Sequence, residues 1–409
     1  MSERIVIIGA GEAGARAAMA LRENGFTGSV TLIGDEPHLP YERPPLSKAV
    51  LNAVDDPAPA FILSEATLTE HDITLMRGTV VTAIDRAAHS VATSDGASLA
   101  YDRLLLATGA RPRRLALPGA DGILYLRSFA DALALRSHLT PERRIVLIGG
   151  GFIGLELAAA ARMRGCAVTV IEMAPRLLGR AVPEAIAAEV ARRHVAEGVR
   201  LILGASIEAI EAGAGGAMIQ LAQGETIACD GIIAGIGAIP ETALAEAAGL
   251  AIDNGIKADE HLRTSDADIF AAGDCCSFPL ALYGGRRVRL EAWRNAQDQG
   301  NHAARALLGA KEPYAAVPWF WSDQYDATLQ IAGLPDEGTQ TVRRDLGEDC
   351  HMLFHLAPDG RLVAASAFGP NGRIAKDVRI AEMLIGRACK PSPGDITNAG
   401  LPLKRLLNV

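Results

Sequence analysis

The sequence predicts an α/β fold of two Rossmann-like domains followed by a small α+β domain at the C-terminal end of the chain. The main observation is a short apolar segment near the N-terminus that runs into the glycine pattern GxGxxG and then into a helical pattern. The same arrangement returns 140 residues further along the chain. From about residue 325 onward, short strand-like segments alternate with polar turns and lead to a helical segment at 373–387.

The first copy begins with residues 4–8, RIVII, which are apolar on both faces, as expected of a strand covered by helices on both sides of a parallel sheet. Gly9 can form the tight turn after this strand, and Gly11 lets the backbone approach a pyrophosphate closely. Gly14 lets the following helix, from Ala13 to about residue 21, pack close to the strand. Because the first turn of a helix has free N–H groups, this copy predicts a site for nucleotide phosphates.

An acidic residue follows the next strand of this unit, residues 29–33. Asp35 lies 24 residues after Gly11, where a dinucleotide-binding fold places the carboxylate that binds a ribose hydroxyl. Glu36 is the competing candidate, and residues 34–37 are also favourable turn sequence. We assign the ribose role to Asp35 because of its spacing.

The second copy starts at residues 144–148, RIVLI, and reproduces the glycine spacing with Gly149, Gly151 and Gly154. A helical pattern follows at 152–164. Two complete units are far more specific than one, because each contains the strand, the turn, the helix and a second strand that ends in an acid. They predict that one polypeptide binds two dinucleotides.

The acid of the second copy also indicates which nicotinamide cofactor is used. Glu172 ends the strand 167–171, where its carboxylate can accept a hydrogen bond from the ribose 2′-hydroxyl and repel a 2′-phosphate. This favours NADH over NADPH. Arg176 and Arg180 lie close in sequence and weaken the preference, since cations at this place can bind a phosphate.

Three further segments carry residues of chemical interest. Two adjacent prolines stiffen residues 41–48, YERPPLSK, in which Arg43 and Lys48 either hold cations against a phosphate or a reducible ring or are ordinary surface charges. Asp274 follows a short strand-like segment and a glycine, and it either forms a turn or binds hydroxyls of a second cofactor. All three tryptophans lie between residues 293 and 321, although tryptophan is more often a core or interface residue than a cofactor contact.

Composition excludes several classes of function. The net charge of −8 argues against a nucleic-acid-binding protein, which needs a basic surface. The six cysteines form neither a C-x-x-C pair nor a zinc-like cluster, which fits reduced thiols in the cytoplasm. The chain reaches its first strand without a signal-like segment, and no apolar stretch is long enough to span a bilayer, so no membrane association is expected.

The linker-like sequence at 111–119 and a predicted return strand at 232–240 divide the chain. We place a discontinuous first domain at 1–113 and 242–318, a second domain at 114–241, and the C-terminal domain at 319–409.

The ordered motifs along the chain resemble those of the FAD-dependent NADH:ferredoxin reductases of bacterial oxygenase systems, which have a glutathione-reductase-like flavoprotein fold. The resemblance covers essentially the whole chain. It is carried by GAGEAG at 9–14, YERPPLSK at 41–48, LLLATG at 104–109, YLRSFADA at 125–132, GGGFIGLE at 149–156, AGIGAIP at 234–240, IFAAGDC at 269–275, LEAWRNAQDQ at 290–299 and PWFWSDQYD at 318–326.

The resemblance implies FAD on the first unit and NADH on the second, with Glu172 on the ribose of NADH. Lys48 and Glu156 match the lysine–glutamate pair that such flavoproteins keep near flavin N5. At the position of Trp293, relatives often have a smaller side chain, so an indole there could change access to the ring. The implied FAD contacts are Ala13, Gly14, Asp35, Arg43, Lys48, Val81, Arg127, Asp274 and Trp293.

The implied partner is a two-iron two-sulfur ferredoxin that serves a haem monooxygenase or a Rieske dioxygenase. The oligomeric state stays open, and we expect a monomer or a weak homodimer. Because such ferredoxins are acidic, a basic patch should steer them. We favour residues 286–289, RRVR, for this patch, and Arg111, Arg113 and Arg114 come second.

Two alternatives stay open. One is a reductase of another acceptor, namely rubredoxin, monodehydroascorbate, a quinone or oxygen. The other is a redox-gated interaction protein that resembles apoptosis-inducing factor. Disulfide-reductase chemistry is excluded, because residues 37–56 lack the C-x4-C pair of those flavoproteins.

Overall fold

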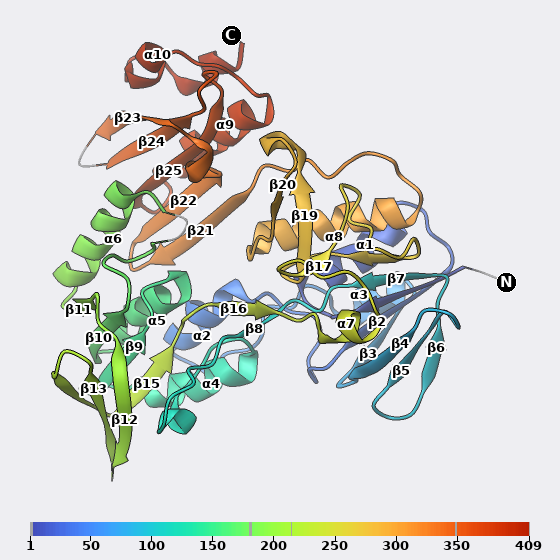
Figure 1. Ribbon diagram of the computed structural model, residues 1–409, viewed down its shortest axis with the longest axis horizontal. Helices are drawn as coiled ribbons and strands as arrows, with labels where there is room; N and C mark the ends of the chain where they lie inside the picture. Colours follow the sequence, from blue (N-terminus) through green and yellow to red (C-terminus); the bar gives the residue numbers. More distant parts are fainter. Residues whose placement is uncertain (1–2, 180–181, 214, 348–349, 409) are drawn as a thin grey trace. The chain divides into compact units, whose positions relative to one another are not determined.

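The computed structural model describes residues 3–179, 182–213, 215–347 and 350–408. The chain divides into two compact units, and each is described by itself. The first contains residues 1–43, 59–111 and 239–318, and the second contains residues 44–58, 112–238 and 319–409. The chain crosses between the units several times, as its colours show in Figure 1.

The first unit is built on a five-stranded parallel sheet with the strand order β18-β7-β1-β2-β3. β1 lies between β2 and β7, so the connections leave it in opposite directions along the sheet. The carboxyl end of β1 is therefore the switch point at which doubly wound folds bind ligands. The strands are β1 (Arg4–Ile8), β2 (Ser29–Gly34), β3 (Ile73–Arg77), β7 (Arg103–Leu106) and β18 (Ile269–Ala271).

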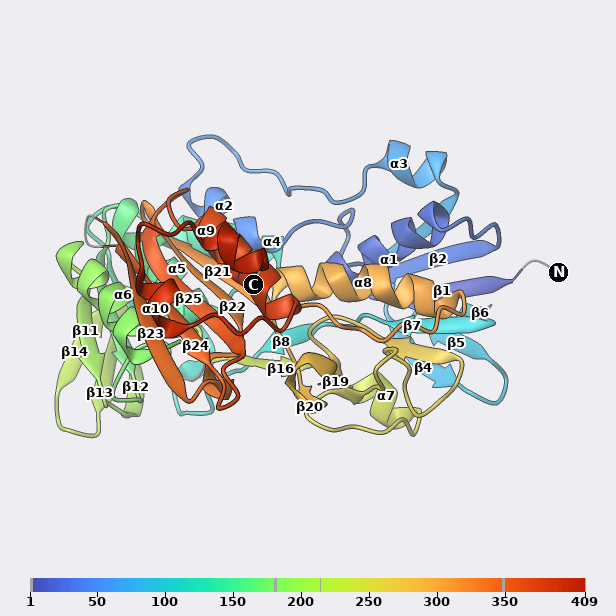
Figure 2. The same cartoon turned by 90° about the horizontal axis from the view of Figure 1, so that it is seen from above.

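Helices α1 (Glu12–Glu23) and α8 (Trp293–Leu307) run side by side in this unit (Figure 2). α8 can approach closely because Gly300 has no side chain: a Cβ there would collide with the carbonyl oxygen of Ala13. The remaining elements are α3 (Glu65–Glu70), β4 (Val81–Asp85), β5 (Ser90–Thr93), β6 (Ser98–Ala100), β8 (Ala110–Pro112), β16 (Ala238–Pro240), α7 (Ala243–Ala247), β17 (Ile256–Lys257), β19 (Cys276–Leu280) and β20 (Arg286–Val288).

The second unit contains a four-stranded parallel sheet with the order β11-β10-β9-β15, in which β9 occupies the same switch-point position. A three-stranded antiparallel sheet, β12-β13-β14, is joined to it. The elements are α2 (Ala49–Asn52), α4 (Phe129–His138), β9 (Arg144–Ile148), α5 (Phe152–Met163), β10 (Ala167–Glu172), α6 (Glu184–Ala196), β11 (Arg200–Leu203), β12 (Ile207–Gly213), β13 (Gly216–Leu221), β14 (Thr226–Cys229) and β15 (Gly231–Ala234).

The C-terminal part of this unit is a five-stranded antiparallel sheet with the order β21-β22-β25-β24-β23. Helix α9 packs on β22 and β25. β21 is an edge strand, and α5 packs against it. The elements are β21 (Trp319–Gln324), β22 (Ala327–Gly333), β23 (Gln340–Gly347), β24 (Cys350–Leu356), β25 (Leu362–Pro370), α9 (Ala375–Gly386) and α10 (Pro393–Thr397).

The predicted fold class is confirmed, and most predicted elements lie within a few residues of their expected ends. One strand differs: the predicted return strand 232–240 is two strands, β15 and β16, with residues 235–237 between them outside either strand. Gly237 has a φ of +107°, which a continuous strand does not allow. The three-domain division stays a prediction, because it cuts the chain differently from the two compact units.

The cysteines are free thiols, and Cys275 and Cys276 are fully buried. Burial raises the pKa of both thiols. Among the described residues, none of the helices combines the length and the apolar character needed to cross a bilayer.

His355 on β24 makes stability depend on pH. Its ring is only 4% exposed, with Nδ1 3.3 Å from the Thr341 hydroxyl and Nε2 3.4 Å from the Ser366 hydroxyl, and burial lowers its pKa to about 4. In the unfolded chain the ring binds a proton below its ordinary pKa of 6.5, whereas the folded chain excludes it until about pH 4. The contribution of His355 to the free energy of unfolding is fully present above pH 6.5. It falls by about 3 kcal/mol as the pH drops to 4.

We therefore expect His355→Leu to flatten the fall in the free energy of unfolding between pH 6.5 and pH 4 by up to about 3 kcal/mol. Denaturant unfolding at several pH values measures this difference, whatever the variant does to stability at neutral pH. If the free energy of unfolding fell equally with pH in the variant and in the parent protein, His355 would not be the source of the pH dependence.

Candidate functional site

The first glycine turn leaves an open space at its middle glycine. A Cβ on Gly9 would collide with the carbonyl oxygen of Ala107 in the loop after β7, and one on Gly14 would collide with the carbonyl oxygen of Gly9. Packing inside the protein thus explains the first and third glycines. A Cβ on Gly11 would meet no atom of the described chain within 4 Å. The space beside Gly11 is therefore open to a molecule that approaches from outside the chain.

The second glycine turn has the same geometry at the end of β9. A Cβ on Gly149 would lie 2.5 Å from the carbonyl oxygen of Gly235, in the loop after β15, and one on Gly154 would collide with the carbonyl oxygen of Gly149. At Gly151 the nearest atom would be the Gly235 oxygen, at 3.9 Å. Both turns thus combine two glycines required by packing with one that faces open space.

Both turns also present the free end of a helix. Gly11 is the N-cap residue of α1 and Gly151 is that of α5. In the part of the chain that the structure describes, no side chain caps either helix. The first-turn N–H groups and the positive end of each helix dipole are therefore available to an anion such as a pyrophosphate.

The strand next to the first turn ends in the two predicted acids. A Cβ on Gly34 would lie 2.7 Å from the Cβ of Ala10, so the end of β2 abuts the turn. Asp35 follows directly and is exposed. Glu36, the competing candidate for the ribose, is instead bound to Arg43, whose Nη2 lies 2.5 Å from its Oε1, and to the Tyr41 hydroxyl. This leaves Asp35 as the better placed of the two acids.

Two other predicted residues lie beside the first turn. Gly273 has a φ of +84°, and a Cβ there would lie 3.1 Å from that of Ala13 and 3.9 Å from that of Ala296. Asp274 follows Gly273, and Trp293 opens α8 one turn before Ala296. Through Gly273 and Ala296, the segments that carry Asp274 and Trp293 thus lie beside the first glycine turn. A turn and a cofactor contact are compatible interpretations of Asp274.

The remaining predicted FAD contacts are more dispersed. Val81 is the half-buried first residue of β4 in the first unit. Arg127 lies in the second unit, where its backbone N–H donates to the Asp131 carboxylate, 3.0 Å away, at the start of α4. Ser128 and Asp131 form a capping box, which fixes this helix end. The roles of Val81 and Arg127 toward a cofactor stay predictions.

Glu172 is held directly over the second turn. Its Oε2 accepts the N–H of Gly150 at 2.6 Å, and its Oε1 accepts the N–H of Ala174 at 2.7 Å. The guanidinium of Arg176 donates instead to backbone carbonyls of its own loop, those of Gly179 at 3.0 Å and Val182 at 3.1 Å among them. Because its guanidinium already has these partners, Arg176 is a weaker candidate for a phosphate ligand. Arg180 lies outside the described residues.

Lys48 and Glu156 form an ion pair within the second unit. Lys48 Nζ lies 2.7 Å from Glu156 Oε2, and the glutamate side chain is only 5% exposed. The Ser47 hydroxyl donates to the same oxygen, and the Ser322 hydroxyl donates to Oε1 at 2.7 Å. A buried carboxylate with a cation and two hydroxyl donors has its charge compensated.

The two serines are site residues that the sequence did not reveal. Ser47 is 109 residues and Ser322 is 166 residues from Glu156 in sequence. Both stand in motifs that carry the family resemblance, YERPPLSK and PWFWSDQYD, which is the one signal that could have indicated them.

Strand β21 presents aromatic residues on both faces. Phe320 packs edge-on against Phe152 of α5, with ring centroids 5.0 Å apart, and Ser322 on the same face reaches Glu156 one helical turn further on. On the other face, Trp319 and Trp321 stack at 5.2 Å with an interplanar angle of 22°. The stack is half-buried, and the Trp321 indole N–H donates to Asp323 Oδ2 at 3.0 Å.

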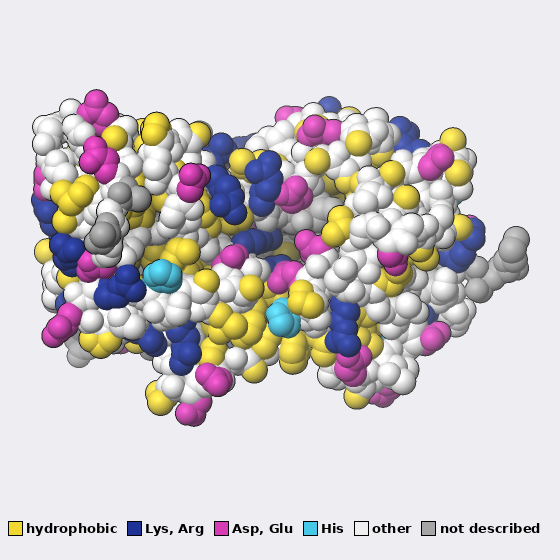
Figure 3. Space-filling view, turned by 90° about the horizontal axis from the view of Figure 1, so that it is seen from below, with side chains coloured by type: hydrophobic (Ala, Val, Ile, Leu, Met, Phe, Trp, Pro, Cys, Tyr) yellow, Lys and Arg dark blue, Asp and Glu magenta, His cyan; other side chains and the backbone are white. Residues whose placement is uncertain are grey.

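The preferred basic patch, residues 286–289, stays a prediction, and two of its cations make contacts within the protein. Arg287 donates to the carbonyl oxygens of Ala258 and Ser277 at 3.0 and 2.7 Å, and Arg289 pairs with Glu291 and donates to the Asp274 carbonyl. These two cations hold loops of their own unit. On the face drawn in Figure 3, acidic and basic side chains are intermixed over each unit.

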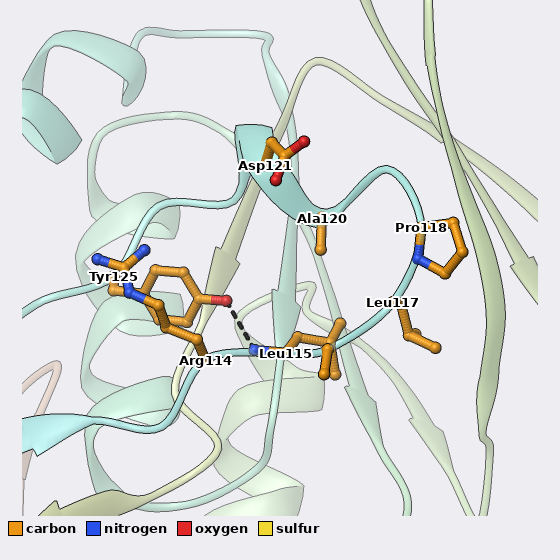
Figure 4. A pocket seen from close by; sticks show the side chains of 8 residues that line it. Arg114, Leu115, Leu117, Pro118, Ala120, Asp121 and Tyr125 are labelled. Carbon is orange, nitrogen blue, oxygen red and sulfur yellow. Dashed lines mark hydrogen bonds between the residues drawn. The ribbon is translucent and has the colours of Figure 1, made fainter.

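The second candidate patch borders a shallow pocket of about 490 Å³ in the second unit (Figure 4). The guanidinium carbon of Arg114 lies 4.9 Å from the centre of the Tyr125 ring, whose hydroxyl accepts the N–H of Leu115 at 2.9 Å. Arg111 pairs with Glu241 at 2.7 Å. The pocket is lined by Arg114, Leu115, Ala116, Leu117, Pro118, Ala120, Asp121 and Tyr125, which include none of the predicted cofactor contacts.

Two open glycine turns at the switch points of two parallel sheets, each with an uncapped helix and an acid nearby, define a protein that binds two dinucleotides. Comparison with known proteins agrees. The family model described as pyridine nucleotide-disulphide oxidoreductase matches residues 3–300, and a reductase C-terminal model matches residues 319–407. The chain belongs to the pyridine nucleotide-disulphide oxidoreductase family, and it is an oxidoreductase.

Similar proteins include the ferredoxin–NAD(+) reductase component of the anthranilate 1,2-dioxygenase system of Burkholderia cepacia, 43% identical over 99% of this chain and 100% of that protein. The rubredoxin–NAD(+) reductase of Pseudomonas putida is 44% identical over 80% of this chain and 86% of its own length. Among solved structures, the reductase in the covalent putidaredoxin reductase–putidaredoxin complex matches with a TM-score of 0.93 and 35% identity, covering 99% of this chain and 98% of that one.

Proposed function

We propose that this protein is an FAD-dependent NADH:ferredoxin reductase that supplies single electrons to a two-iron two-sulfur ferredoxin of an oxygenase system. The observation that carries the proposal is the pair of open glycine turns on one chain, one in each unit. Similarity over the whole chain to a reductase component of a dioxygenase system supports the ferredoxin as acceptor. Six free cysteines fit a reducing compartment such as the cytoplasm.

The residues present fit both cofactors. The first turn, with Gly11 open and Asp35 exposed beside it, would hold the pyrophosphate and a ribose of FAD. The second turn, with Gly151 and Glu172, would hold those of NADH. Bound FAD supplies chemistry that side chains lack, because it accepts electrons as a hydride and releases them one at a time.

Lys48 is the residue proposed to assist hydride transfer. A cation is most stabilising where negative charge develops, and charge arrives on the flavin with the hydride. Glu156 holds the ammonium at 2.7 Å, so Lys48 is preorganised rather than mobile in solvent. This role rests on the family resemblance together with the ion pair.

Glu172 should set the preference for NADH. Replacing it with alanine removes both the hydroxyl acceptor and the charge that repels a 2′-phosphate. We expect the KM for NADH to rise about tenfold and the preference for NADH over NADPH to narrow by about the same factor. Steady-state kinetics with both coenzymes measure this, and Glu208→Ala, an exposed glutamate on β12, is the control. An unchanged NADH-to-NADPH ratio would remove Glu172 from the ribose site.

The acceptor is tested by turnover with purified proteins. NADH-dependent reduction of a two-iron ferredoxin should far exceed reduction of rubredoxin, a small quinone or oxygen. The similarity to a rubredoxin reductase makes rubredoxin the second candidate acceptor, and faster turnover with rubredoxin would replace ferredoxin in the proposal. Slow turnover with every acceptor would favour a redox-gated interaction protein.

A further inference from the structure

We propose that Ser322, Gln324 and His194 are positioning residues that hold the Glu156 carboxylate, and through it Lys48, by one directional chain of hydrogen bonds. The proposal deepens the proposed function and rests on the role of the Lys48–Glu156 pair in it. The chain joins three elements that are distant in sequence: Glu156 on α5, Ser322 and Gln324 on β21, and His194 on α6.

The contacts form an unbroken series. The Ser322 hydroxyl lies 2.7 Å from Glu156 Oε1, and Gln324 Nε2 lies 3.1 Å from the Ser322 hydroxyl. Gln324 Oε1 lies 2.9 Å from His194 Nε2, and His194 Nδ1 lies 3.2 Å from the Tyr325 hydroxyl. Ser322 and His194 are 0% exposed and Gln324 is 1% exposed. In so dry an interior each donor and acceptor must be matched, because an unmatched one costs about 1–3 kcal/mol.

Counting protons fixes the direction of the chain. Glu156 accepts from Lys48, and a hydroxyl has one proton to give, so Ser322 donates it to the carboxylate and must accept from Gln324. The amide nitrogen of Gln324 therefore faces Ser322, and its oxygen faces His194. An amide oxygen only accepts, so His194 carries its proton on Nε2.

The outer end of the chain is consistent with this tautomer. With the proton on Nε2, His194 Nδ1 accepts from the Tyr325 hydroxyl. Burial lowers the pKa of His194 and raises that of Tyr325, so the ring stays neutral and the phenol keeps its proton. Arg193 lies over the Tyr325 ring at 5.4 Å and pairs with Asp326 at 2.7 Å, which anchors this end. Every dipole then points its positive end toward Glu156, and such chains reinforce one another.

The register of β21 makes the arrangement specific. Ser322 and Gln324 are two residues apart, so they lie on the same face of the strand as Phe320. Phe320 packs on Phe152, one helical turn before Glu156 on α5. The C-terminal sheet thereby supplies both an apolar and a polar contact to the helix that carries the glutamate. This gives the C-terminal part of the second unit a role in the site.

The variants Ser322→Ala and Gln324→Leu interrupt the series of hydrogen bonds that leads to Glu156. Ser322→Thr keeps the hydroxyl group, and Ser366→Ala is the matched control. Ser366 is also 0% exposed, lies in the same sheet on β25 and bonds a buried histidine, His355, but it does not contact Glu156. We expect the first two variants to slow flavin reduction by NADH about tenfold, and the threonine variant to restore most of the rate.

A second readout separates positioning from general destabilisation. If Lys48 is displaced, reduced FAD loses a stabilising charge, and a tenfold loss of relative affinity for reduced FAD lowers its midpoint potential by about 30 mV. We expect this shift for Ser322→Ala and not for Ser366→Ala, whatever their melting temperatures. Equal potentials in these two variants and the parent protein would overturn the proposal.

Two further results make the test decisive. Nitrogen NMR of the histidine rings in the parent protein should show His194 neutral with its proton on Nε2. A proton on Nδ1 would overturn the proposed direction of the hydrogen bonds.

The variant Lys48→Ala is measured in parallel. If it changes the reduction rate and the potential while Ser322→Ala does not, the positioning role alone fails. If Lys48→Ala changes neither, the proposed role of the pair fails and the positioning role fails with it.

Discussion

Replacing Gly11 with alanine should yield a folded protein that binds FAD much more weakly than the parent protein. The backbone at Gly11 has ordinary angles, φ −82° and ψ −166°, and the added Cβ would meet no described atom within 4 Å. The fold therefore tolerates the methyl group. The pyrophosphate does not, because the methyl would occupy the space through which it approaches the helix end.

The expected loss of FAD affinity is about ten- to a hundredfold, which corresponds to an overpacking cost of about 1–3 kcal/mol. Titration of apo-protein with FAD, followed by flavin fluorescence, measures it. Gly122→Ala is the matched control, since a Cβ there also meets no described atom within 4 Å. If the Gly11 variant bound FAD as tightly as the control variant, the first turn would not be the FAD site.

Replacing the neighbouring glycines should have a different outcome. Alanine at Gly9 would collide with the Ala107 carbonyl, and alanine at Gly14 would collide with the Gly9 carbonyl. These variants should lose stability before any question of cofactor binding arises. A variant series along one turn therefore separates residues that build the fold from the residue that admits the ligand.

Replacing Lys48 with alanine should slow reduction of the flavin by NADH about a hundred- to a thousandfold, the usual effect of removing one preorganised group from a site where charge develops. The Kd for NADH should change little, because the predicted contacts of NADH lie at the second turn. Rapid mixing under anaerobic conditions separates the two quantities. Lys376→Ala, an exposed lysine on α9 of the same unit, should behave as the parent protein does.

This variant also leaves Glu156 buried without its cation, which costs about 3–5 kcal/mol when a buried pair is broken. The double variant Lys48→Met with Glu156→Gln removes both charges and should recover most of the stability but none of the rate. Recovery of the rate together with stability would mean that Lys48 acts only as a structural ion-pair partner.

The parts of the fold that were predictable are those encoded locally. The first helix was expected from Ala13 to about residue 21 and runs from Glu12 to Glu23, and the two strands that precede the glycine turns lie at the expected residues. Their signals are short-range: an apolar run, a glycine spacing and a helical pattern. The same holds for Glu172, whose distance from its turn is set within one strand–helix–strand unit.

The parts that were not predictable depend on contacts distant in sequence. The carboxylate partners Ser47 and Ser322, and His194 beyond them, stand more than a hundred residues from the groups that they bind. The contacts of the predicted basic patch could not be predicted from the sequence for a related reason. Nothing near Arg287 in the sequence indicates that the carbonyl of Ala258, 29 residues away, accepts from its guanidinium.

The most direct test of the account is a single-turnover experiment on the FAD-loaded protein without oxygen. One equivalent of NADH should bleach the flavin, and excess oxidised two-iron ferredoxin should then restore the flavin colour while two ferredoxin molecules are reduced for each NADH. A flavin that stays oxidised with NADH, or a reduced flavin that ferredoxin does not reoxidise, would contradict the account.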